Sequence, residues 1–274
     1  MARRGPARWC LAIPVAALAL GCARAEPAPS LPRADGGRTA LRVHGPAAGC
    51  PDTVIFSHGL GGSEAGAAGL AEALAAKGWR VMVMGHAESG RGVLREALQG
   101  ADPRQRLVAA ATDPARHRAR LADLDATLHE ATRHCRPRRL VLAGHSMGAA
   151  TTMLEAGATG RAGAAGADRF DAYVAISPQG VGVYWEEGAW RAVRKPVLMV
   201  TGTRDAGLDG DHTTRLAAFD GLPPGPHRLA VIEGAGHLAL AGDGAAMGAI
   251  LARLMADFLA GEPSAIAGVR VRAR

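Results

Sequence analysis

The sequence is poor in aromatic side chains and in lysine. Aromatic residues make up 4% of the 274 residues, and Lys77 and Lys195 are the only lysines among 32 basic residues. The arginines are scattered along the chain, although the formal net charge is +7. Proteins that bind nucleic acid typically combine a basic patch with aromatic stacking residues. We therefore expect a solvated basic surface and no nucleic-acid partner.

Motifs that hold metal ions or nucleotide cofactors are also missing. The sequence contains no H-E-x-x-H motif and no pair of C-x-x-C motifs, which are common zinc-binding patterns. It contains no P-loop, and no G-x-G-x-x-G pattern opens a helix after a strand. We therefore expect neither a metal ion nor a cofactor.

The N-terminal apolar stretch is too short to cross a bilayer. It covers residues 11–20, is interrupted by Pro14 and follows an arginine-rich start. This pattern is typical of an export signal, which we place at residues 1–25, with a linker at residues 26–38. The mature protein is therefore expected in the periplasm or outside the cell.

Two endings of this signal remain open. Residues 23–25, Ala-Arg-Ala, fit the site of an ordinary signal peptidase, which would leave Glu26 first. Residues 19–22, Ala-Leu-Gly-Cys, resemble a bacterial lipobox, in which Cys22 would carry a lipid anchor. Any membrane attachment is expected to be limited to that anchor.

The most informative motif is the pentapeptide Gly-His-Ser-Met-Gly at residues 144–148. It directly follows the apolar run 140–143 and precedes residues 149–154, which can continue as a helix. A serine at a sharp turn from strand to helix projects its hydroxyl out of the sheet, and small residues two positions away let the backbone pass closely. The pattern makes Ser146 a candidate nucleophile.

Three other apolar runs end in residues that a serine nucleophile would need: a glycine-rich loop, an aspartate and a histidine. Residues 54–62 end in His-Gly-Leu-Gly-Gly, residues 197–205 end in Asp205, and residues 229–237 end in His237. The chain order is therefore serine, aspartate, histidine, which is the order of the α/β-hydrolase triad. In a parallel sheet, ligands collect at the carboxyl ends of the strands, where all four motifs are expected.

These motifs resemble the α/β-hydrolase superfamily over roughly residues 53–260. The stretch His-Gly-Leu-Gly-Gly-Ser is most similar to the dienelactone-hydrolase and small-carboxylesterase branch. The alternation of short apolar runs with helical stretches also predicts an α/β fold, with a mostly parallel sheet covered by helices on both faces. We assign residues 39–262 to one catalytic domain and residues 263–274 to a C-terminal tail.

The resemblance gives each site residue a role. Ser146 is the expected nucleophile, His237 the base that takes its proton, and Asp205 the acid that orients the imidazole. The backbone N–H groups of Met147 and Leu60 are the expected oxyanion donors.

Other side chains near these motifs have open or supporting roles. Asp209 and Asp211 compete with Asp205 on the same loop, but Asp205 is favoured because it comes first after the strand. We expect His58 to support its loop by hydrogen bonding and His145 to flank the nucleophile structurally.

The candidate substrate pocket rests on fewer residues. The segment 178–195, where this superfamily often carries a lid, is short, so we expect a minimal lid and an open, shallow site for short or medium acyl esters. Candidate wall residues are His86, Tyr184, Trp185 and Trp190. The alternative for the three aromatic residues is simple packing of a short helix, and for His86 it is an ordinary position in a loop.

The fold also brings two cysteines together. Cys50 precedes the strand that leads to His58, and Cys135 precedes the strand that leads to Ser146. These strands are neighbours in the α/β-hydrolase fold, and exported proteins meet an oxidising compartment. The resemblance thus implies a Cys50–Cys135 disulfide, with two free thiols as the alternative.

The resulting hypothesis is an exported serine carboxylesterase that acts on a small-molecule ester through an acyl-enzyme. An acyltransferase with the same triad and a non-catalytic envelope binding protein on the same scaffold remain open. Dienelactone hydrolysis is disfavoured, because that family typically has cysteine at the position of Ser146. The sequence gives no indication of the oligomeric state.

Overall fold

The computed structural model describes residues 29–161 and 163–274. The predicted export signal and the lipidation of Cys22 lie outside these residues. Within them, no helix is both long enough and apolar enough to cross a membrane.

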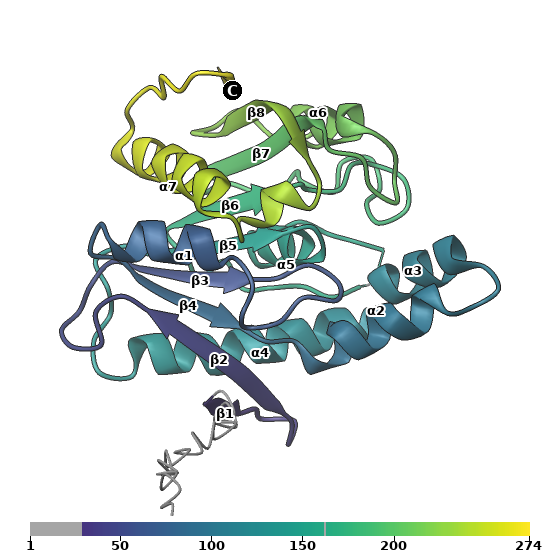
Figure 1. Ribbon diagram of the computed structural model, residues 1–274, viewed down its shortest axis with the longest axis horizontal. Helices are drawn as coiled ribbons and strands as arrows, with labels where there is room; N and C mark the ends of the chain where they lie inside the picture. The colour runs from purple at the N-terminus through teal and green to yellow at the C-terminus, as the bar shows by residue number, and fades with distance from the viewer. Residues whose placement is uncertain (1–28, 162) are drawn as a thin grey trace, which may run out of the picture.

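One twisted sheet runs through the molecule (Figure 1). It has nine strands in the order β1-β2-β4-β3-β5-β6-β7-β8-β9. The strands are β1 Ser30–Pro32, β2 Arg38–His44, β3 Thr53–Ser57, β4 Arg80–Met84, β5 Leu140–His145, β6 Ala172–Ile176, β7 Val197–Arg204, β8 Arg228–Gly236 and β9 Val269–Ala273. The strands from β4 to β8 pair in parallel, whereas β1, β2 and β9 pair antiparallel at the two edges.

Helices cover both faces of this sheet. They are α1 Ala68–Ala75, α2 Arg91–Leu98, α3 Pro103–Thr112, α4 Pro114–Thr132, α5 Met147–Glu155, α6 His212–Asp220 and α7 Ala245–Ala260, with short 3-10 turns η1 Ala87–Ser89 and η2 Ala239–Ala241. Buried side chains of α1 and α7 pack on one face, and those of α4, α5 and α6 pack on the other. Side chains alternate between the two faces along a strand, so Ile55 joins one core and Phe56 the other.

The expected α/β architecture is therefore confirmed, but the edges of the sheet differ from the prediction. Residues 30–32, which we assigned to a linker, form β1, and residues 269–273, which we assigned to a tail, form β9. Both are short edge strands, β1 with three residues and β9 with four of its five residues exposed, so they lack the apolar runs that reveal the central strands.

Two segments lie over the carboxyl end of the sheet. Residues 58–67 form a loop there, and α1 begins only at Ala68. The polar segment 88–112 contains η1, α2 and α3. These helices lie beyond the arrowheads of the parallel strands (Figure 1).

The predicted disulfide is present. Cys50 and Cys135 are bonded, with their Cα atoms 6.1 Å apart. The bond joins the segments that enter β3 and β5, which are adjacent in the sheet.

Candidate active site

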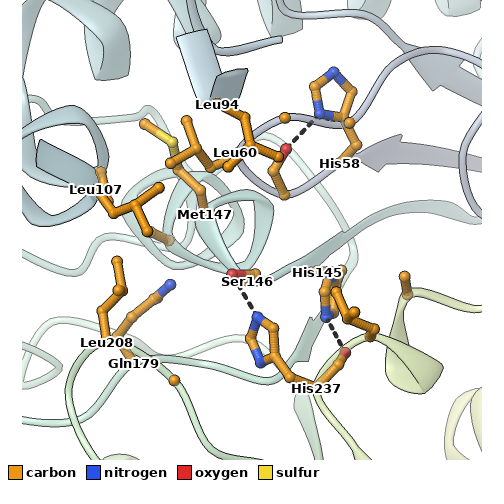
Figure 2. A pocket seen from close by; sticks show the side chains of 18 of the residues that line it. His58, Leu60, Leu94, Leu107, His145, Ser146, Met147, Gln179, Leu208 and His237 are labelled. Carbon is orange, nitrogen blue, oxygen red and sulfur yellow. Dashed lines mark hydrogen bonds between the residues drawn. The ribbon is translucent and has the colours of Figure 1, made fainter. Parts of the chain in front are cut away.

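The four sequence motifs meet at the carboxyl ends of the parallel strands. Leu60 follows β3, Ser146 follows β5, Asp205 follows β7 and His237 follows β8. Figure 2 shows Ser146 at the start of its helix with the His237 ring directed at its hydroxyl.

Ser146 occupies a strained turn between β5 and α5. Its backbone has φ 55° and ψ −118°, a conformation that L residues rarely adopt. The turn brings the two motif glycines against neighbouring backbone. A Cβ atom on Gly148 would lie 1.9 Å from the Ser57 carbonyl oxygen, and one on Gly144 would lie 2.2 Å from the Gly148 oxygen. Both glycines are therefore required by close packing, which explains the pentapeptide.

Ser146, His237 and Asp205 form one chain of hydrogen bonds. The Ser146 hydroxyl donates to His237 Nε2 at 3.0 Å, and His237 Nδ1 donates to Asp205 Oδ1 at 2.8 Å. This arrangement fixes the imidazole tautomer that accepts a proton from the serine. The geometry is that of a nucleophile, a base and an orienting acid.

Asp205 is completely buried but remains ionised. Burial opposes its negative charge, yet the hydrogen bond from His237, the nearby Arg215 cation and the Ser177 hydroxyl together lower its pKa to about 2. The second carboxylate oxygen, Oδ2, accepts from Ser177 at 2.7 Å and from Thr201 at 2.8 Å. The acid is therefore held in one orientation with its charge intact.

The two competing aspartates have other partners. Both carboxylate oxygens of Asp209 bind Arg215, and Asp209 also accepts the Gly180 N–H. Asp211 caps the first turn of α6 by accepting the Thr213 N–H. Of the three aspartates on this loop, the structure brings Asp205 to His237.

His145 supports the base from behind. Its ring lies 4.8 Å from the His237 ring, centroid to centroid, and its Nε2 donates to the His237 carbonyl at 2.9 Å. Burial lowers the pKa of His145 to about 3, so its ring is neutral near pH 7. It therefore holds the His237 backbone without adding a charge.

Two backbone N–H groups beside Ser146, those of Met147 and Leu60, are candidate oxyanion donors. Met147 is the first residue of α5, so its N–H has no carbonyl one turn earlier to bind. Among the hydrogen bonds of the described residues, none uses the Leu60 N–H. A Cβ atom on Gly59 would lie 3.2 Å from the Ser146 Cβ, so this loop runs directly beside the serine.

A cavity of about 630 Å³ adjoins Ser146. Its wall is mostly apolar and includes Leu60, Leu94, Leu107, Met147, Val183 and Leu208. Leu94 and Leu107 belong to α2 and α3, so these helices border the site that we expected to be open. The sequence did not single them out, because their leucines are widely spaced in a charged segment. Cavities of this size commonly bind small organic molecules.

The predicted wall residues separate into two groups. Tyr184 lines the cavity, while its hydroxyl donates to His117 Nδ1 at 2.8 Å. Trp185 and Trp190 do not line it; they are 0% and 1% exposed and belong to the buried core that also contains residues of α5. Both rings are the largest fully buried side chains of the described residues, so their role is packing.

His86 also lies away from the cavity. It is buried between two polar side chains, accepting from the Ser57 hydroxyl and donating to Asp123, each at 2.8 Å. This second Ser-His-Asp chain is 0% to 2% exposed, so no substrate reaches it. Within the described residues, no group of His, Cys, Asp or Glu side chains is arranged to hold a metal ion.

Comparison with known proteins supports the fold. No family model matches the chain, and no curated protein matches it either. A solved structure from Thermoplasma acidophilum, described as a predicted CIB-like hydrolase, is similar with a TM-score of 0.54 and 17% sequence identity. The similarity covers 85% of this chain and 97% of that chain. Together with the sheet order and the serine turn, it shows that the chain has the α/β-hydrolase fold.

Proposed function

We propose that the protein is a serine hydrolase that cleaves carboxylic esters through an acyl-enzyme intermediate. The observation that carries this proposal is the hydrogen-bonded chain from Ser146 through His237 to the ionised, buried Asp205. A free serine hydroxyl is too weak an acid to attack an ester, and a positioned imidazole removes that limitation.

The reaction divides into two steps. His237 Nε2 takes the Ser146 proton as Oγ attacks the ester carbonyl, and the same nitrogen then protonates the departing alcohol. Water then attacks the acyl-enzyme while His237 takes a proton from it. The same proton returns to Ser146 Oγ as the carboxylic acid leaves. The N–H groups of Met147 and Leu60 would stabilise the negative oxygen of each tetrahedral intermediate.

The cavity supports an apolar acyl group of short to medium length. Its leucine-rich wall begins at Met147 and Leu60, beside the nucleophile, and reaches Leu107 and Leu208. Burial of each methylene contributes about 0.8 kcal/mol, so chain length is expected to affect the rate until the cavity is filled.

We also propose that the protein works outside the cytoplasm. The Cys50–Cys135 bond supports this, because disulfides persist mainly in oxidising compartments. Mass spectrometry of the mature protein distinguishes the two signal endings. An unmodified Glu26 start would exclude lipidation of Cys22.

Hydrolysis of p-nitrophenyl acetate, butyrate and octanoate tests the catalytic proposal. We expect turnover by the wild type and a loss of at least about 10³-fold in Ser146→Ala. Asp205→Asn should lose a comparable amount because the imidazole tautomer is no longer fixed, whereas Asp211→Asn should retain activity. Equal rates in the wild type and Ser146→Ala would reject the proposal. Product analysis with an added alcohol would reveal acyl transfer.

A further inference from the structure

A buried cation lies behind the loop that carries Leu60. Arg120, on α4, is 1% exposed, and no carboxylate of the described residues forms an ion pair with it. Burial lowers its pKa to about 9, which leaves it charged near neutral pH. Asp123 and Glu88 are the acidic groups near it. An unpaired buried charge is costly and therefore needs a structural or functional explanation.

Three of the four hydrogen bonds donated by the Arg120 guanidinium go to residues 57–59, directly before Leu60. One terminal nitrogen donates to the His58 carbonyl at 2.7 Å and to the Ser57 hydroxyl at 3.2 Å. The other donates to the Gly59 carbonyl at 3.4 Å. Nε donates to the Ser89 hydroxyl at 3.0 Å.

These contacts hold Leu60 from both sides. Arg120 binds the two carbonyls that precede Leu60 directly. On the other side, the Gly61 N–H donates to the carbonyl of Ser89, whose hydroxyl Arg120 also binds. The loop is thus fixed at positions 58, 59 and 61, while the N–H at position 60 is left free.

The contact to Gly59 has an electronic consequence. The Gly59 carbonyl and the Leu60 N–H belong to one peptide group, and a carbonyl that accepts a hydrogen bond makes the N–H of its own peptide a better donor. The Gly59 carbonyl accepts from His58 Nδ1 at 2.7 Å as well as from Arg120 (Figure 2 shows the His58 bond). Burial lowers the pKa of His58 well below its usual value, so Arg120 supplies the positive charge.

We propose that Arg120 is a positioning residue that aims and polarises the Gly59–Leu60 peptide as an oxyanion donor. This inference rests on the proposed esterase function. The ester carbonyl is neutral when the substrate binds and becomes negative in the tetrahedral intermediate. Arg120 therefore acts mainly on the chemical step and little on substrate binding.

The test compares Arg120→Gln and Arg120→Lys with the wild type. Glutamine keeps a donor without the charge, and lysine keeps the charge with fewer directed donors. We measure kcat and KM for p-nitrophenyl butyrate and the affinity for butylboronic acid, which adds to Ser146 Oγ as a tetrahedral anion. For Arg120→Gln we expect kcat and boronic-acid affinity to fall together by about 10-fold, with KM nearly unchanged. Arg120→Lys should recover part of both losses.

Tyr173→Phe provides the matched structural control. It removes another buried hydrogen bond, to Asp168, away from the site, and should lower stability while kcat and boronic-acid affinity stay unchanged. If the Arg120 variants do not fold, Ser89→Ala replaces them, because it removes one Arg120 partner and keeps the carbonyl that binds Gly61.

The outcomes separate the two proposals. Wild-type boronic-acid affinity in Arg120→Gln, or in Ser89→Ala if that variant is used, would overturn the role of Arg120 even if kcat falls. Absence of Ser146-dependent turnover in the wild type would instead reject the esterase function.

Discussion

The Nε atom of Arg215 lies 3.6 Å from Oδ2 of Asp205, and both side chains are almost completely buried. The same guanidinium binds both oxygens of Asp209 at 2.6 Å. Asp209 in turn accepts the Gly180 N–H, so one arginine connects the acid beside His237 with two loops that line the cavity. The orientation of Asp205 and the shape of the cavity therefore share a support.

We predict that Arg215→Met changes the pH dependence of activity, through Asp205, and lowers the stability of the protein, through Asp209. Loss of the cation removes one of the interactions that lower the pKa of Asp205, so this carboxylate should be protonated at a higher pH and activity should be lost earlier on acidification. The unpaired Asp209 should lower the free energy of unfolding by roughly 3 kcal/mol or more. Urea unfolding of the double variant Arg215→Met/Asp209→Asn is the control and should show partial recovery. An unchanged pH profile in the single variant would contradict the electrostatic role.

Leu107 should limit the length of the acyl chain. Its side chain lines the cavity from α3, so Leu107→Trp is expected to reduce octanoate hydrolysis several-fold more than acetate hydrolysis. Leu98→Trp is the matched control, because Leu98 is 53% exposed on the neighbouring helix and does not line the cavity. Identical chain-length profiles for the two variants would place the acyl chain elsewhere.

Stability should fall steeply below pH 6.5. Burial strongly lowers the pKa of four histidines in the folded protein, His58, His86, His117 and His145, and lowers the pKa of His44 and His227 to a smaller extent. Between pH 6.5 and about 4 these histidines bind protons in the unfolded chain but not in the folded chain. Their contribution to the free energy of unfolding is therefore fully present above pH 6.5 and is lost as the pH falls. Each histidine contributes a slope approaching about 1.4 kcal/mol per pH unit.

Urea unfolding at several pH values tests this expectation. His145→Gln keeps a donor for the His237 carbonyl but no longer titrates, so its slope should be smaller by about 1.4 kcal/mol per pH unit. A slope equal to that of the wild type would show that His145 is not neutral in the folded state.

The sequence motifs predicted where Ser146, Asp205 and His237 lie better than they predicted the contacts that support these residues. Ser146, Asp205 and His237 each follow an apolar run, so their position at strand ends can be recognised from local pattern. The supporting contacts join residues that are far apart, such as Arg120 and His58, which are separated by 62 positions. No local pattern distinguishes these buried arginines from the many surface ones.

The same reasoning explains the missed structural elements. The edge strand β9, Val-Arg-Val-Arg-Ala, alternates with a period of two, which indicates a strand, although its arginines are equally typical of a solvated tail. Trp185 and Trp190 were candidates for the pocket because aromatic residues suit both a core and a ligand site. Only tertiary packing decides between these two roles.

Removal of the disulfide should lower stability substantially. The bond closes a loop across 85 positions, and native bonds of this kind typically contribute about 2–5 kcal/mol. Thermal and urea unfolding of Cys50→Ser/Cys135→Ser will measure the loss, and the wild type in reducing agent is the control. Equal stability in all three would show that the sheet does not depend on the bond.

The disulfide also has a consequence for the distant end of the sheet. Thr53 pairs with Leu140 near the bond, and Ser57 pairs with Gly144 at the opposite end of the same two strands. A slip of one residue between them would turn every side chain to the wrong face. A covalent link between the segments that enter β3 and β5 therefore favours the same register that places Leu60 and Ser146 around one cavity at the other end. An oxidising compartment, in which the bond persists, would thus support the arrangement of the candidate site.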